Sequence, residues 1–89
     1  MHKNENLQIC RICGLKQPDL PWGVDENTPT FDYCYCCGVE FGYQDSNIDA
    51  IRKYRTKWIR EGAVWNEPEQ RPSNWSLEEQ LKDIPEKYL

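Results

Sequence analysis

The sequence has a single histidine and no long apolar run, and each shortage excludes a class of function. His2 is the only histidine among the 89 residues, so schemes in which a histidine activates a nucleophile lack a well-placed base. No stretch approaches the roughly 20 apolar residues that a membrane-spanning helix needs, and the polar first ten residues lack the apolar core of a signal peptide. We therefore expect a cytoplasmic protein that does not bind membranes and is not an enzyme.

Apolar residues are also scarce, at 38% of the chain. A chain of this length forms one small domain, and such domains often need a staple because they bury a modest share of their surface. Four tryptophans and five tyrosines compensate in part, since each aromatic side chain buries roughly 150–250 Å². We expect one domain over residues 1–89, with a mobile lead-in at 1–8 and a cross-link or metal that stabilises the rest.

The charge is acidic overall and unevenly spread. Eleven Lys and Arg against 15 Asp and Glu give a net charge of -4, which repels phosphate backbones and attracts basic proteins. Basic residues concentrate between 48 and 62, where Lys53, Lys57 and Arg60 share one face of a predicted helix. Because the surrounding chain is acidic, a solvated helix face explains them better than a nucleic-acid site. The sequence therefore favours a protein partner over a nucleic acid.

Five cysteines carry the clearest chemical signal, and four of them form two matching C-x-x-C-G motifs. In a reducing cytoplasm such pairs are typical of metal ligands rather than of disulfides. The two-residue gap lets a tight turn aim both sulfurs at one point, and the glycine leaves room for backbone amides near them. Two facing turns would place four sulfurs about 2.3 Å from one ion. We predict a structural Zn²⁺ held by Cys10, Cys13, Cys34 and Cys37.

Two questions about the cysteines stay open. Iron is an alternative to zinc, because paired C-x-x-C-G motifs near aromatic residues are also the rubredoxin arrangement for electron transfer; the long helix expected after the second motif argues against it. Thiols without metal, or a disulfide, are a further alternative. Cys36 is the surplus thiol, and we interpret it as a semi-buried apolar residue whose side chain points away from the metal.

The pattern of residues 9–45 predicts a zinc ribbon of short antiparallel strands. Alternation at 31–33 and again at 39–41 is typical of strands, and a hairpin across 34–38 would join them. With a helix packed on this ribbon, the fold class is α+β.

Residues 46–89 are expected to form a helical extension. Residues 47–61 have helical periodicity, and Ser46 is a good N-cap. A Ser-Leu-Glu-Glu capping box predicts a short C-terminal helix over 77–83. The face of the first helix that should be buried consists of Ile48, Ile51, Trp58 and Ile59.

Between Pro21 and Asp45 the chain carries a Pro-Trp-Gly loop and the stretch Cys-Tyr-Cys-Cys-Gly-Val-Glu-Phe-Gly-Tyr, downstream of the first C-x-x-C-G. With these motifs it resembles the bacterial cysteine-rich CPCC family, except that Tyr35 stands where that family has proline. Residues 58–62 and 71–75 also look like the family's downstream part, so the resemblance covers nearly the whole chain. It implies a small zinc-ribbon-like protein, and some small bacterial proteins of this kind accompany toxins as immunity proteins.

We expect the folded protein to bind another protein, and an immunity protein that occludes a basic toxin or effector is the specific form of this hypothesis. Trp and Tyr carry binding energy at interfaces, and an acidic surface steers a basic partner. The alternatives are an iron electron carrier and a nucleic-acid-binding zinc ribbon. The candidate partner-binding residues near the ribbon are Trp22, Asp25, Glu26, Glu40 and Asp45. A second acidic group consists of Glu67, Glu69, Glu78 and Glu79.

Overall fold

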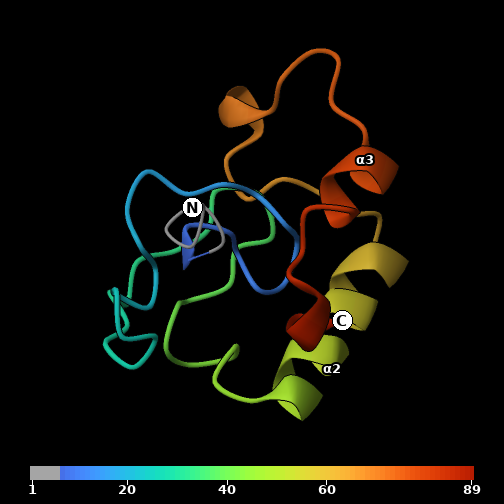
Figure 1. The fold of residues 1–89 in the computed structure, drawn as a ribbon. Helices are drawn as coiled ribbons and strands as arrows, with labels where there is room; N and C mark the ends of the chain where they lie inside the picture. The colour runs from blue at the N-terminus through green and yellow to red at the C-terminus, as the bar shows by residue number, and fades with distance from the viewer. Residues whose placement is uncertain (1–6) are drawn as a thin grey trace.

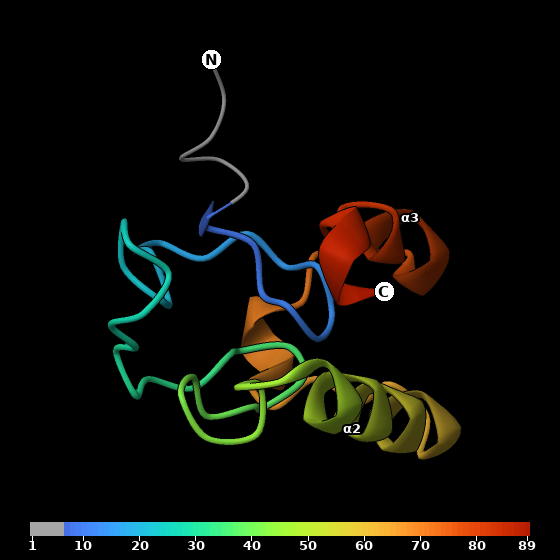
Figure 2. The same ribbon diagram turned by 60° about the horizontal axis from the view of Figure 1, so that its bottom comes forward.

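The second half of the chain carries the 13-residue helix α2 and a succession of shorter helical turns. The computed structural model describes residues 7–89, so most of the lead-in expected at 1–8 lies outside the described residues. From residue 48 onward the elements are α2 (Ile48–Arg60), the 3₁₀ turn η1 (Pro68–Gln70), α3 (Leu77–Leu81) and the 3₁₀ turn η2 (Glu86–Tyr88). Figures 1 and 2 both show the loops of the first half on one side of the molecule and α2 with α3 on the other. No helix within residues 7–89 combines the length and apolar character needed to pass through a lipid bilayer.

The predicted α+β zinc ribbon is wrong, because residues 7–89 form no β-strand and no sheet. Extended pairing within the described residues is limited to two isolated antiparallel bridges, one between Ile9 and Lys16 and one between Tyr33 and Glu40. Each bridge closes one cysteine turn and extends no further. The fold is a set of loops packed against helices.

Backbone conformation on both sides of the second bridge explains why no hairpin extends from it. Phe31, expected to begin a strand, has a φ of +65°, a left-handed conformation that a strand does not contain. Gly42 has a φ of +99°, and the Tyr43 N–H donates to Glu40 O at 3.1 Å. The chain therefore turns immediately after Phe41, and the alternating pattern marks a single bridge.

Helix α2 lies within the predicted range of 47–61 but has a different N-cap. The side chain of Asn47 accepts a hydrogen bond from the Ala50 N–H at 2.8 Å. Ser46, the predicted cap, instead donates its hydroxyl to Tyr43 O at 3.3 Å. Both residue types cap helices well, and the turn that precedes the helix decides between them.

One face of α2 packs on the cysteine-rich loops. Ile51 and Trp58 are 1% and 7% exposed, and the Trp58 Nε1–H donates to Val64 O at 3.0 Å. Ile59, which was expected on the same buried face, is 37% exposed. The buried stripe is thus narrower than the apolar pattern predicts.

The segment after α2 folds back over the same core. Trp65 is buried and meets Trp75 in a T-shaped contact, with ring centroids 5.6 Å apart. Ser76 caps α3 by accepting from the Glu79 N–H at 3.3 Å, and the helix ends at Leu81, two residues before the predicted end. The turn η2 then packs on α2.

Sulfur and aromatic side chains form much of the core. All five cysteines are free thiols and all are buried, and they pack with a few aliphatic residues that include Ile12 and Val39. The Cα radius of gyration is 12.1 Å, close to the roughly 12 Å expected of a folded chain of this length. The loops are therefore drawn around the cysteines rather than extended into solvent.

Candidate metal centre

Each C-x-x-C-G motif folds as one tight turn, here called a knuckle. In the first knuckle (residues 9–16) the Gly14 N–H donates to Cys10 O at 3.1 Å, and the Cys10 N–H donates to Leu15 O at 2.9 Å. The second knuckle (residues 33–40) repeats both bonds, from Gly38 N–H to Cys34 O and from Cys34 N–H to Val39 O, each at 3.0 Å. The repeated motif thus produces the same local geometry twice.

The glycine that ends each motif adopts a left-handed conformation. Gly14 and Gly38 have φ values of +89° and +79°, which cost other residues about 1–2 kcal/mol. A Cβ atom at Gly14 would also collide with the carbonyl oxygen of Gln80. Glycine at position 14 therefore allows the chain around α3 to close over the first knuckle.

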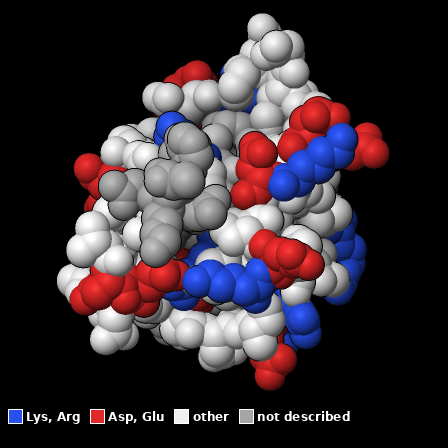
Figure 3. Space-filling model, in the orientation of Figure 1, with Lys and Arg blue, Asp and Glu red and all other residues white. Residues whose placement is uncertain are grey.

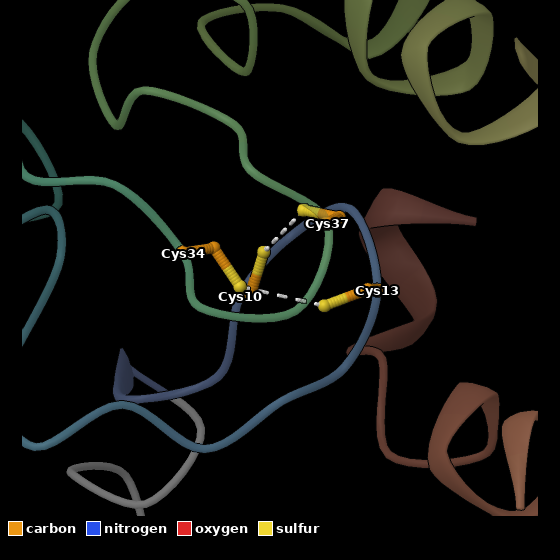
Figure 4. A group of neighbouring side chains, drawn as sticks. All are labelled: Cys10, Cys13, Cys34 and Cys37. Carbon is orange, nitrogen blue, oxygen red and sulfur yellow. Dashed lines mark hydrogen bonds between the residues drawn. The ribbon is translucent and has the colours of Figure 1, made fainter. Parts of the chain in front are cut away.

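The two knuckles face each other, and their four sulfur atoms converge (Figure 4). The Sγ atoms of Cys10, Cys13, Cys34 and Cys37 all lie within 4.8 Å of one another. Cys10 Sγ is 3.7 Å from Cys37 Sγ, and Cys13 Sγ is 3.7 Å from Cys34 Sγ. A tetrahedron with metal–sulfur bonds of about 2.3 Å has edges of about 3.8 Å. The donor set and its spacing therefore fit one tetrahedral metal ion.

Burial and neighbouring thiols change the pKa values of three of these cysteines. Burial raises the pKa of Cys13 and also that of Cys37. Neighbouring thiols, Cys10 first among them, point hydrogen-bond donors at Cys34 and lower its pKa. Without a cation Cys13 and Cys37 therefore keep their protons, because burial disfavours their thiolate forms. A divalent ion would replace those protons with a charge that satisfies all four sulfurs.

Helix α2 holds both knuckles in place through two adjacent side chains. Arg55 Nε donates to Ile12 O at 2.7 Å, and Arg55 Nη2 donates to Arg11 O at 2.8 Å. The Tyr54 hydroxyl donates to Cys37 O at 2.9 Å. One residue thus binds the first knuckle and its neighbour binds the second. Sequence reasoning missed Arg55, although its place four residues after Ile51 on the buried face was an available signal.

Two glutamines complete the surroundings of the sulfurs. Gln17 Nε2 donates to Cys34 Sγ at 3.4 Å. Gln80 Nε2 donates to Cys13 O at 3.0 Å and to Cys36 Sγ at 3.4 Å. Cys36 is fully buried rather than semi-buried, and it does not belong to the four-cysteine group. No pattern in the sequence distinguishes these glutamines from surface ones.

Among the predicted partner-binding residues, Trp22 and Asp45 bind each other. The Trp22 Nε1–H donates to Asp45 Oδ2 at 2.9 Å, and the Gly42 N–H donates to Asp45 Oδ1 at 2.8 Å. Asp45 is 0% exposed, so its carboxylate stabilises the interior and does not reach a partner. Half-buried Trp22 also stacks on the guanidinium of Arg11, 4.1 Å from the ring centroid.

The other acids predicted near the ribbon have different hydrogen-bond partners. Glu26 binds Lys87 Nζ at 2.9 Å, and this hydrogen bond lowers the pKa of Glu26. Asp25 accepts from the Asn27 N–H, which lowers the pKa of Asp25. Glu40 belongs to the second knuckle. Part of the predicted acidic charge is therefore neutralised within the protein by Lys87, and Figure 3 shows acidic and basic atoms side by side over α3 and the C-terminal segment.

Comparison with known proteins finds relatives that align with about three quarters of this chain. It is 36% identical to YoaQ of Bacillus subtilis (strain 168) over 83 residues, an alignment that covers 76% of this chain and 70% of YoaQ. The chain belongs to the YoaQ family. A second relative, YozI of the same strain, is 37% identical over 82 residues and is covered to 68%.

Both of these YoaQ-family relatives are uncharacterized proteins. No family model matches the sequence, so the resemblance to the CPCC family stays a prediction. No solved structure matches either.

Proposed function

We propose that this member of the YoaQ family is a small protein-binding module stabilised by one structural zinc ion. The observation that carries the metal assignment is the convergence of four buried sulfurs with tetrahedral spacing. Four protein ligands leave no open coordination position, which is the arrangement of structural rather than catalytic zinc sites. The free thiols are consistent with a reducing compartment, and the proposal places the protein in the cytoplasm.

Elemental analysis of the purified protein tests the metal. We expect one zinc per chain and a colourless solution, because zinc has no visible absorption. The variant Cys37→Ala should lose the metal, whereas the matched control Cys36→Ala should retain one ion because Cys36 lies outside the ligand group. A red protein with one iron per chain would instead support electron transfer. Retention of the metal by Cys37→Ala would contradict the ligand set.

The protein-binding part of the proposal is supported by the surface. Phe31, Tyr33, Tyr35 and Tyr43 are between 46% and 68% exposed, and exposed aromatic side chains are enriched at protein interfaces. The net charge of -4 favours a basic partner. Occlusion of a basic toxin or effector is the specific form of this proposal.

Affinity capture with the metal-loaded protein, using extract of the source cell, tests partner binding. We expect a partner that rebinds as a purified protein and that dissociates at high salt, because charge contributes to the contact. A mobility-shift titration at low salt addresses the basic face of α2, where Lys53, Lys57 and Arg60 are exposed. Specific nucleic-acid binding through that face would contradict the proposal.

A further inference from the structure

A groove of about 390 Å³ opens beside the second knuckle. Its lining includes two prolines, Pro18 and Pro21, and three aromatic rings, those of Tyr33, Tyr35 and Phe41. Phe41 is buried, whereas Tyr33 and Tyr35 are 58% and 46% exposed. The groove therefore presents the rings of Tyr33 and Tyr35 to solvent, next to Phe41 of the core.

The charges in this groove have one sign. Asp19, Asp32 and Glu67 line it, and no lysine or arginine among residues 7–89 does. None of the three forms an ion pair within these residues. The carboxylate of Glu69 lies close enough to raise the pKa of Glu67, as expected when two acids meet without a cation between them. The groove thus combines aromatic surface with negative charge that no lysine or arginine of the described residues 7–89 balances.

The second knuckle holds this groove in shape. Tyr33 and Tyr35 flank the ligand Cys34, so the knuckle sets the positions of both rings. The Glu67 N–H donates to Tyr35 O at 2.8 Å, which ties the acidic segment to the same turn. Gln17, which also lines the groove, donates to Cys34 Sγ at 3.4 Å. Loss of the metal should therefore disorder the groove.

We propose that this groove binds an extended, arginine-containing segment of a partner protein. The inference rests on the proposed protein-binding function and names its surface and the chemistry of its partner. The guanidinium of the bound arginine stacks on Tyr33 and Tyr35 and pairs with the acids at the rim. Arginine suits this combination better than lysine, because its planar group both stacks on aromatic faces and binds carboxylates with two donors.

The protein already uses this kind of contact internally. The guanidinium of Arg11 lies 4.1 Å from the ring centroid of Trp22 and 4.6 Å from that of Tyr88, so it is held between two aromatic rings. Arg71 lies 5.2 Å from the centroid of Trp75. The groove offers the same aromatic partners with no internal arginine to fill them.

A titration with a defined peptide tests the groove. The probe is a fluorescently labelled peptide of alternating arginine and proline, with matched peptides in which lysine or glutamate replaces arginine. We expect the arginine peptide to bind several-fold more tightly than the lysine peptide and the glutamate peptide not to bind. In ¹⁵N spectra the amide signals of Tyr33, Tyr35 and Glu67 should shift. Shifts confined to α2, or equal binding of the lysine and arginine peptides, would overturn the proposal.

Variants test the acidic and the aromatic contributions to peptide binding separately. The double reversal Asp32→Lys/Glu67→Lys should weaken peptide binding roughly tenfold or more, because it removes two favourable charges and adds two repulsive ones. The matched control Glu78→Lys changes an exposed acid on α3 and should leave binding within about twofold. Tyr35→Phe keeps the ring and should retain binding, whereas Tyr35→Leu should lose it. Metal content is measured on each variant, so that a folding defect is recognised.

The captured partner distinguishes failure of this inference from failure of the proposed function. A partner that binds the Asp32→Lys/Glu67→Lys variant as tightly as the original protein overturns the groove and leaves the protein-binding function standing. Self-association that disappears when Lys53 and Lys57 become glutamate also overturns the inference, because the occupant would then be α2 of a second copy. Loss of the partner with the double reversal, but not with Glu78→Lys, supports both proposals.

Discussion

At the scale of single residues, two glycines with left-handed backbones differ in what surrounds them. Gly14 and Gly62 both have left-handed φ values, +89° and +105°. A Cβ atom at Gly14 would collide with the backbone of Gln80, whereas one at Gly62 would meet only Val64 Cγ2 at 3.6 Å. An alanine would therefore strain the backbone at both positions, but it would create a steric clash only at position 14.

We predict that Gly62→Ala lowers the free energy of unfolding by about 1 kcal/mol, the cost of a left-handed alanine. Gly14→Ala should lower it by more than about 2 kcal/mol, because the α3 segment must also move away from the first knuckle. Urea denaturation of the metal-loaded proteins measures both values. Equal destabilisation would mean that the contact with Gln80 is unimportant.

Arg55 supports a second prediction at this scale. Its guanidinium donates to three backbone carbonyls, those of Arg11, Ile12 and Tyr88. A lysine cannot reach all three with its single ammonium group, so Arg55→Lys should cost about 2–3 kcal/mol of stability. The exposed Arg60→Lys on the same helix should change stability by less than about 0.5 kcal/mol. Thermal unfolding of the two variants compares them, and similar midpoints would count against the anchoring role of Arg55.

At the scale of elements, the start of α2 depends on one side chain. The N-cap is Asn47, whose Oδ1 atom accepts from the Ala50 N–H, and Ser46 takes no part in capping. Asn47→Ala should destabilise the protein by about 1 kcal/mol, the usual value of an N-cap. Ser46→Ala should have little effect on the midpoint of chemical denaturation. Greater destabilisation by Ser46→Ala than by Asn47→Ala would show that Ser46 is the N-cap, as the sequence predicts.

The elements that were predicted from the sequence are those with local signals. Helix α2 and the capped start of α3 follow from periodicity and from Ser76. The predicted strands do not form. The left-handed conformation of Phe31 interrupts the first of them. Nothing about a phenylalanine in a sequence indicates a positive φ, because this conformation is imposed by the surrounding loop.

At the scale of the whole molecule, the metal is expected to control stability. Burial raises the pKa of Cys13 and of Cys37, so protons compete with the cation for these sulfurs. Metal binding, and the stability it adds, should be present at neutral and alkaline pH and decline as the pH falls, because each thiolate that becomes protonated loses its bond to the ion. A chelator added at neutral pH should produce the same loss of structure.

A coloured metal indicator added across a pH series measures the release, and tryptophan fluorescence follows the unfolding. The two signals should change together, since the cysteines and the tryptophans Trp58 and Trp65 share one core. Release of the metal with no change in fluorescence would show that the fold is independent of the ion.

The sequence by itself determined the local chemistry of this protein. Each C-x-x-C-G motif forms its own turn, because the two backbone hydrogen bonds that both knuckles repeat join residues four and five positions apart. The four candidate ligands and the place of the main helix could therefore be predicted without coordinates.

Only the tertiary structure decided which surfaces remain available. It buried Asp45 against Trp22, turned Arg55 and Gln80 toward the knuckles, and left Tyr33 and Tyr35 exposed above an acidic groove. These contacts join residues far apart in the chain, and their energies depend on burial that no local pattern encodes. For this reason the candidate metal ligands could be predicted from the sequence, whereas the proposed partner-binding groove could be found only in the fold.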